Sequence, residues 1–292
     1  MSDKPLQRAL GTTYRAEMSC GDLGKAIRQA ATGPTPGEHT LREARVMQAS
    51  LTAVGKEIEQ QQEPTIAQEL RTPVAAALAD YAQDTGEILN AVNDAYIDHE
   101  DDGAWQDGKT VRMSAPLDEL IDVLRALSQS PDAYADLRAA HVRQCAVGLA
   151  AVPSRAAGPT YTAPGRNCAA GLGYYDGIAE DIPDSQSKQW RSDVLQRLRN
   201  SMGTPPAYST DPAQHITASW QRDAVRQVKV GGSGFLTDDS TRILDIWATA
   251  RGDDLDARKL DALQEDMGSD ACSRAEETTK QLACTREPSK CP

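Results

Sequence analysis

Six cysteines spread along the chain constrain its fold most, because they can cross-link segments that lie far apart in the sequence. They are Cys20, Cys145, Cys168, Cys272, Cys284 and Cys291. No two of them form a C-x-x-C pair, which argues against a zinc site or a thioredoxin-like redox motif. Dispersed cysteines in even number are typical of a disulfide framework, which forms and persists in an oxidising compartment. The alternative interpretation is that all six are free thiols in a cytosolic protein.

We expect all six cysteines to pair within the chain, although six cysteines allow 15 connectivities. We favour Cys145–Cys168, because this bridge would clamp the end of one predicted helix to the start of the next. For the others we expect Cys272–Cys284 or Cys284–Cys291, with Cys20 joined to the C-terminal tail.

The apolar residues are mostly of the helix-forming kind. The 292-residue chain has one Phe and four Trp, and Ala and Leu carry most of its hydrophobic surface. Ala and Leu favour helices, and chains poor in aromatic and β-branched residues rarely form extended sheets. We therefore predict an all-α fold of one or more helix bundles with short irregular loops, stabilised by disulfides. One small β-hairpin is predicted over 105–113, around the turn signal Asp107-Gly108.

Two consecutive helices have start signals at Ser114 and at Ser130-Pro131. The first carries an apolar stripe at helical spacing, formed by Leu117, Leu120, Ile121, Leu124 and Leu127. The short connection predicts that the two helices pack as antiparallel neighbours, with the stripe in the core. The alternative is an exposed stripe that binds a partner.

Residues 153–167, with the sequence PSRAAGPTYTAPGRN, are rich in Pro, Gly and small side chains. This composition is typical of a linker. We predict an N-terminal helical subdomain over 1–152 and a C-terminal helical subdomain over 168–292.

The charge balance argues against several classes of partner. The formal net charge is −12 and the pI about 4.8, which disfavours binding to nucleic acids or to anionic membranes. No apolar run is long enough to span a bilayer. The first residues, MSDKPLQRALGTTYRAEM, lack the apolar core of a signal peptide. We expect that a leader has been removed and that the mature protein is extracellular or at the cell surface, with lipid anchoring or leaderless export as alternatives.

The acidic stretch Asp98-His99-Glu100-Asp101-Asp102-Gly103 partly matches a calcium-binding EF-hand loop. Asp98, Glu100 and Asp102 take the first, third and fifth positions, and Gly103 takes the sixth. The match fails at the twelfth position, where Lys109 replaces the bidentate Glu. We expect an exposed loop with weak Ca²⁺ binding at most and no other cofactor.

No short catalytic or phosphate-binding motif is present in the sequence. The four histidines form no H-E-x-x-H pair, the stretch around Ser233 reads GGSGF rather than G-x-S-x-G, and a dinucleotide fingerprint is missing. A group of aromatic residues in the C-terminal half is the candidate binding groove: Trp190, Trp220, Trp247, Tyr174 and Tyr175. Aromatic residues on amphipathic helices more often lie in the core.

One part of the chain resembles a known class of proteins. The runs APLDELIDVLRALSQSPDAYADLRAAH and GLGYYDGIAEDIPDSQSKQWRSDVLQRL, within about residues 114–200, are similar to a helical region of large actinobacterial secreted proteins, the polymorphic-toxin and type VII-secretion-associated chains. The shared features are a helix, a Ser-Pro-Asp-Ala-Tyr restart, a second helix and a later Tyr-Asp-containing helix. The chain departs from these proteins in its cysteines and lacks an evident toxin module. The resemblance implies an extracellular helical scaffold and assigns no catalytic residue.

We therefore expect an exported, disulfide-bonded helical binding or scaffold protein that is not an enzyme and whose partner is another protein. The alternative is a secreted hydrolase or toxin with its site in the C-terminal half. In that case the Trp and Tyr residues would line a pocket, and Asp238, Asp239 or His215 would supply its polar groups.

Overall fold

Helices form nearly all the regular structure of the computed structural model, which describes residues 19–60, 65–100, 103–229, 235–252 and 257–286. The elements are α2 (Cys20–Ala31), α3 (Leu41–Glu59), α4 (Gln68–Leu78), a 3₁₀ turn (Ala79–Tyr81), α5 (Ala82–Asn90), α6 (Asp94–Asp98), β1 (Ala104–Asp107), β2 (Thr110–Met113), α7 (Leu117–Ser128), α8 (Pro131–Ala150), α9 (Pro159–Glu180), α10 (Asp184–Asn200), α11 (Pro212–Gln227), α12 (Asp239–Arg251) and α13 (Ala257–Arg286). The predicted all-α fold class is confirmed. Among the described helices, none is both long and apolar enough to cross a membrane.

Capping side chains fix where several helices begin. The Ser130 side chain accepts a hydrogen bond from the Ala133 backbone at the start of α8, and Pro131 takes the first helical position. Asp211 caps α11 in the same way ahead of Pro212. Ser114 does not cap α7, because its hydroxyl donates to the backbone oxygen of Tyr96 and the helix begins three residues later.

The predicted hairpin is present. β1 and β2 pair antiparallel, with Trp105 opposite Arg112 and Asp107 opposite Thr110. Gly108 has a φ of 59°, a left-handed conformation that glycine adopts without steric cost. The Asp107-Gly108 signal therefore identified the turn correctly.

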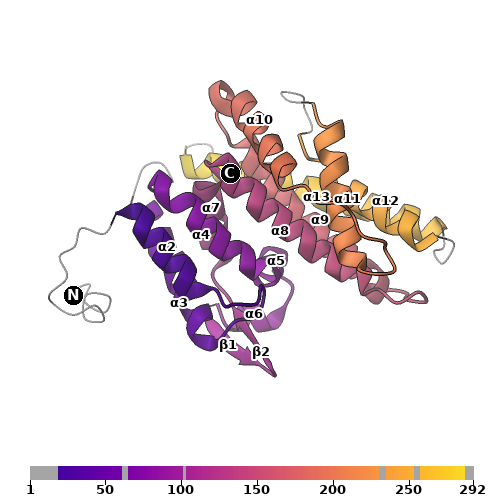
Figure 1. Ribbon diagram of the computed structural model, residues 1–292, viewed down its shortest axis with the longest axis horizontal. Helices are drawn as coiled ribbons and strands as arrows, with labels where there is room; N and C mark the ends of the chain where they lie inside the picture. The colour runs from indigo at the N-terminus through magenta and orange to yellow at the C-terminus, as the bar shows by residue number, and fades with distance from the viewer. Residues whose placement is uncertain (1–18, 61–64, 101–102, 230–234, 253–256, 287–292) are drawn as a thin grey trace.

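Helix α8 runs through the middle of the molecule, with α2 to α7 on one side and α10 to α12 on the other (Figure 1). It packs against α4, α5, α7, α9, α10, α11 and α12. A helix with neighbours all round is buried on most of its surface, and even Arg138 and His141 of α8 are buried. Most of the apolar stripe of α7 is core as well: Leu120, Ile121, Leu124 and Leu127 are buried, and Leu117 is partly buried against them.

A disulfide joins Cys145 of α8 to Cys168 of α9, with their Cα atoms 5.1 Å apart. This is the pairing favoured from the sequence. The expectation that all six cysteines are bridged is wrong for Cys20 and Cys272, which are free and exposed. A Cys272–Cys284 bridge is excluded because both residues lie on α13, where twelve residues rise about 18 Å. Cys291 and the side chain of Cys284 lie outside the described residues.

The linker prediction needs correction at its C-terminal side. Residues 159–167 belong to α9, which begins at Pro159 directly after Gly158, whose φ is 57°. Proline suits the first turn of a helix, so Pro159 starts α9 rather than interrupting it. Pro164 lies further in and is accommodated. The division into two subdomains stays a prediction, although one hydrophobic cluster contains residues from both sides of the 151–158 loop.

Helix α13 packs along α9 over most of the length of both helices. Glycines of α9 make this close approach possible. A Cβ on Gly173 would lie 2.4 Å from the backbone oxygen of Ala271, and one on Gly177 would lie 2.6 Å from Cβ of Thr278. The α9–α13 seam, as we call this contact, therefore depends on the absence of side chains at these two positions.

Candidate functional site

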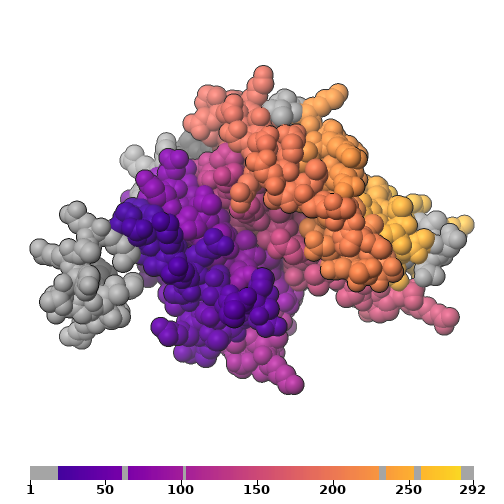
Figure 2. Space-filling view, in the orientation of Figure 1, coloured from indigo at the N-terminus to yellow at the C-terminus, as the bar shows by residue number. Residues whose placement is uncertain are grey.

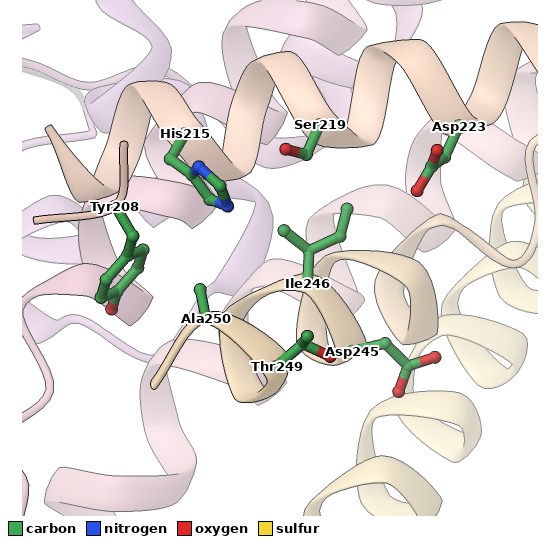
Figure 3. A pocket seen from close by; sticks show the side chains of 8 residues that line it. All are labelled: Tyr208, His215, Ser219, Asp223, Asp245, Ile246, Thr249 and Ala250. Carbon is green, nitrogen blue, oxygen red and sulfur yellow. The ribbon is translucent and has the colours of Figure 1, made fainter. Parts of the chain in front are cut away.

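A groove with a volume of about 530 Å³ lies between α11 and α12. We call it the α11–α12 groove. Helices α10 and α11 form much of the visible surface of the C-terminal half (Figure 2). The lining residues are Tyr208, His215, Ser219, Asp223, Asp245, Ile246, Thr249 and Ala250 (Figure 3). The groove is open to solvent.

The α11 wall of the groove consists of residues spaced four apart. His215, Ser219 and Asp223 follow one another at successive turns and therefore share one face of the helix. The buried residues Ile216 and Trp220 lie on the neighbouring face and hold α11 against the core. Because Ile216 and Trp220 face the core, the face that carries His215, Ser219 and Asp223 is turned toward α12 (Figure 3).

The α12 wall runs in the opposite direction. In Figure 3, Asp245 lies toward the same end of the groove as Asp223, and Ala250 lies toward the same end as His215. The groove therefore has an acidic end, formed by the two carboxylates, and an aromatic end, formed by His215 and by Tyr208 from the segment before α11. The rings of Tyr208 and His215 meet edge to face, with their centroids 5.8 Å apart.

The backbone fixes the tautomer of His215. Its Nδ1 lies 2.7 Å from the carbonyl oxygen of Pro206. Because a carbonyl oxygen only accepts hydrogen bonds, Nδ1 must carry a proton and donate it. In the neutral ring Nε2 then has a free lone pair, which can accept a hydrogen bond from a ligand.

Four polar side chains of the groove are free to bind a ligand. Within the described residues, Ser219, Asp223, Asp245 and Thr249 form no side-chain hydrogen bond or ion pair. Desolvation at the groove raises the pKa of Asp245 above its ordinary value. A neighbouring cation would lower this pKa, and no charged group of the described residues contributes to the shift.

The position of α12 is fixed by a buried ionic cluster at its N-terminal end. Arg138 of α8 is fully buried and donates from Nε to Asp239 at 3.0 Å and from Nη2 to the Leu236 carbonyl at 2.7 Å. Its Nη1 lies 2.8 Å from Asp176 of α9. Arg242 binds the second carboxylate oxygen of Asp239. We call Arg138, Asp176, Asp239 and Arg242 the Arg138 cluster.

The C-terminal end of α12 is also fastened. Arg251 donates to the carbonyl oxygen of Val152 and lies over the ring of Trp247, 5.4 Å from its centroid. Both ends of α12 are thus bound to the body of the molecule, so the groove is preformed.

The aromatic residues proposed from the sequence do not line this groove. Their exposed fractions are all 5% or less; they are Trp190, Trp220, Trp247, Tyr174 and Tyr175. The Trp190 indole donates to the Ser128 carbonyl at 2.9 Å inside the core. The predicted groove lined by these side chains is therefore replaced by ordinary core packing, as large apolar areas favour.

Of the predicted calcium ligands, Asp98 lies at the end of α6 and is exposed, and Glu100 follows it. Asp102 lies outside the described residues. Gly103 has a φ of 77°, as a sharp turn requires. The described residues contain no cluster of three or more His, Cys, Asp or Glu side chains placed to hold a metal. Weak Ca²⁺ binding by this loop stays a prediction.

Of the polar groups proposed for an enzyme, the structure places only His215 in the groove. Asp239 is fully buried and bonded to two arginines, so it is unavailable to a substrate. Asp238 is exposed at the N-terminal boundary of α12 and is not among the lining residues. Four polar residues that line the groove were not predicted from the sequence, namely Tyr208, Ser219, Asp223 and Asp245. The four-residue spacing on α11 was a signal for one wall, but it did not indicate which helix lies opposite.

The groove presents polar and charged side chains from both of its walls. Among the described contacts, the Ser219 hydroxyl has no hydrogen bond to His215, so no nucleophile–base pair is formed. The backbone N–H groups of both walls, beyond the first turns, are engaged within their helices and offer no oxyanion hole.

The chain has no match among protein-family models, curated proteins or solved structures. The inference about what it does therefore rests on the geometry of the α11–α12 groove.

Proposed function

We propose that this protein is a non-enzymatic helical binding module that acts outside the cytoplasm and holds part of a partner protein in the α11–α12 groove. One observation carries the proposal: a preformed groove of about 530 Å³ in which Ser219, Asp223, Asp245 and Thr249 have no intramolecular partner among the described residues. Polar side chains that converge on a concave surface and are not used internally are typical of a binding site.

The disulfide supports the location. The Cys145–Cys168 bridge is buried between α8 and α9, and bridges of this kind persist where the environment is oxidising. The resemblance of about residues 114–200 to secreted actinobacterial helical regions agrees with export.

The test of this proposal blocks the groove without changing its charge. Thr249→Tyr places a ring in the groove, and Thr279→Tyr makes the same change at an exposed position on α13. Each variant is used as bait in a pull-down from the native extracellular and envelope fractions, with quantitative mass spectrometry. We expect one partner to be retained by the wild type and Thr279→Tyr and lost by Thr249→Tyr. Equal retention by all three would contradict the proposal.

A secreted hydrolase with its site in the same groove is the second candidate. It is favoured by the free lone pair of His215 Nε2 in a groove that also contains two carboxylates. A hydrolase would convert the captured partner, so mass spectrometry should find new termini or altered masses that disappear in His215→Ala. Under the binding proposal the partner recovered by the wild type is intact, and His215→Ala changes only the amount recovered.

A further inference from the structure

We propose that the partner inserts an arginine side chain into the α11–α12 groove, with its guanidinium between Asp223 and Asp245. This inference rests on the proposed binding function and names the chemical group that the groove selects. It follows from the charges, the contacts and the shape of the groove.

The two carboxylates lie on opposite walls at the same end of the groove (Figure 3). Neither is neutralised within the described part of the chain. A guanidinium presents several N–H donors in one plane and can bond two carboxylates at once. An ammonium group is a more strongly hydrated point charge, so the geometry favours arginine over lysine.

The two arginines of α12 already form contacts outside the groove. Arg242 is bonded to Asp239 in the Arg138 cluster, and Arg251 is bonded to the Val152 carbonyl. On α11, Arg226 lies one turn beyond Asp223, but no ion pair joins them among the described residues. Among the described residues, neither carboxylate of the acidic end is therefore paired with a cation, and a ligand can supply one.

The middle and the far end of the groove fit the rest of an arginyl segment. Ile246 and Ala250 offer apolar surface to the methylene stem, and the hydroxyls of Ser219 and Thr249 can bond its polar backbone. The Tyr208 and His215 rings close the other end. A ligand with a guanidinium at one end and an apolar group at the other satisfies both ends together.

A metal ion fits this groove less well than an arginine. Calcium takes six to eight oxygen ligands and usually several carboxylates, and the described residues provide no cluster of three or more metal-ligating side chains. The formal net charge of −12 also favours encounter with a basic partner, because a negative surface steers cations toward it.

The test uses Nα-benzoyl-arginine amide, whose benzoyl group can reach the aromatic end, titrated into the 292-residue protein by isothermal calorimetry at low salt. Nα-benzoyl-citrulline amide is the neutral isostere, and Nα-benzoyl-lysine amide tests the choice of cation. For the arginine probe we expect a dissociation constant in the range of roughly 0.1–1 mM, as is usual for a ligand of this size. The citrulline probe should bind about tenfold more weakly or worse, and the lysine probe several-fold more weakly.

Asp223→Asn and Asp245→Asn should each weaken binding of the arginine probe by about fivefold to tenfold, because each removes one charge-assisted contact. Asp261→Asn, at an exposed position on α13, is the matched control and should leave binding unchanged. Equal binding of the arginine and citrulline probes, equal binding of the arginine and lysine probes, or no binding of the arginine probe up to about 10 mM would overturn the inference.

The outcomes for the two proposals are separable. If Thr249→Tyr loses the native partner while Asp223→Asn and Asp245→Asn retain it, the binding function stands and the arginine inference fails. If none of the three variants loses the partner, the binding function itself fails. Loss of the partner in all three, with retention by Asp261→Asn, supports both.

Discussion

Two pairs of aspartates in the C-terminal half have opposite roles. Asp176 and Asp239 are buried and share Arg138, whereas Asp223 and Asp245 line an open groove and have no cation among the described residues. Burying a charge is tolerated only when a partner offsets the loss of hydration. The first pair is therefore part of the architecture, and the second is available to a ligand.

The largest expected effect comes from the buried side of this comparison. Arg138→Met has similar length but leaves Asp176 without its cation in the core, so we expect a loss of about 3–5 kcal/mol in the free energy of unfolding. Urea denaturation followed by circular dichroism measures it. Arg138→Lys keeps the charge and should lose less. A loss below about 1 kcal/mol for Arg138→Met would show that the cluster is dispensable.

The next effect is a pH dependence of the folding stability, and it comes from another buried side chain, His141. Its Nε2 lies 3.3 Å from the Cys168 carbonyl, which accepts a hydrogen bond, and its Nδ1 has no hydrogen-bond partner in the described structure. Burial lowers the pKa of His141 to about 4. Between pH 6.5 and 4 the unfolded chain binds a proton here and the folded protein does not, so the stability falls as the pH falls through this window, by up to about 3 kcal/mol.

The His141 contribution must be measured as a difference, because two buried carboxyls act in the opposite direction. Burial raises the pKa of Asp84 and that of Asp176 to about 7. Their folded forms take up protons between about pH 4 and 7, so their contributions increase the stability as the pH falls. Unfolding of wild type and His141→Gln is compared at pH 7 and pH 4.5. An equal change in both proteins would contradict the prediction for His141.

A smaller effect tests how tightly the helix that carries Asp176 is held. Gly173→Ala forces a methyl group toward the Ala271 carbonyl in the α9–α13 seam, and we expect a loss of about 1–3 kcal/mol. Gly268→Ala on α13 is the matched control, since a Cβ there meets nothing within 4 Å. It should stabilise by about 0.5–1 kcal/mol through helix propensity. Equal thermal midpoints for the two variants would show that the α9–α13 seam can accommodate a methyl group at Gly173.

The smallest expected effect lies in the groove. Asp223→Asn and Asp245→Asn should change the unfolding free energy by no more than about 0.5 kcal/mol, because neither carboxylate has an intramolecular partner in the described structure. Chemical denaturation of both variants measures this. A loss of unfolding free energy comparable to that of Arg138→Met would mean that these aspartates stabilise the fold. The two pairs of aspartates would then not differ in role.

Local signals in the sequence were enough for much of the fold. Ser130-Pro131 and Asp107-Gly108 predicted the start of α8 and the hairpin turn because caps and turns depend on neighbouring residues. The Cys145–Cys168 bridge could be predicted from the sequence because it joins consecutive helices. The linker prediction failed at Pro159, where composition suggested a flexible segment but the position at a helix start decided the structure.

The groove was not predictable in the same way. One wall was encoded in the spacing of His215, Ser219 and Asp223, but the other depends on where α12 docks. That position is set by the contact between Arg138 and Asp239, which are 101 residues apart in the sequence. Nothing in the local pattern around Arg138 indicated that it would be buried. Contacts of such long range are a property of the packed molecule.

The anchoring of Leu236 and Asp239 by Arg138 has a consequence for the kinetics of binding. Leu236 has a φ of 57°, which leucine rarely adopts, and its carbonyl is held by the buried guanidinium. Helix α12 cannot swing away from α11 without exposing the Arg138 cluster, so opening of the groove is linked to unfolding of the core. A ligand therefore meets a wall that is already in place. Association should then be a single second-order step that is fast and slows with added salt, with no slower rearrangement following it.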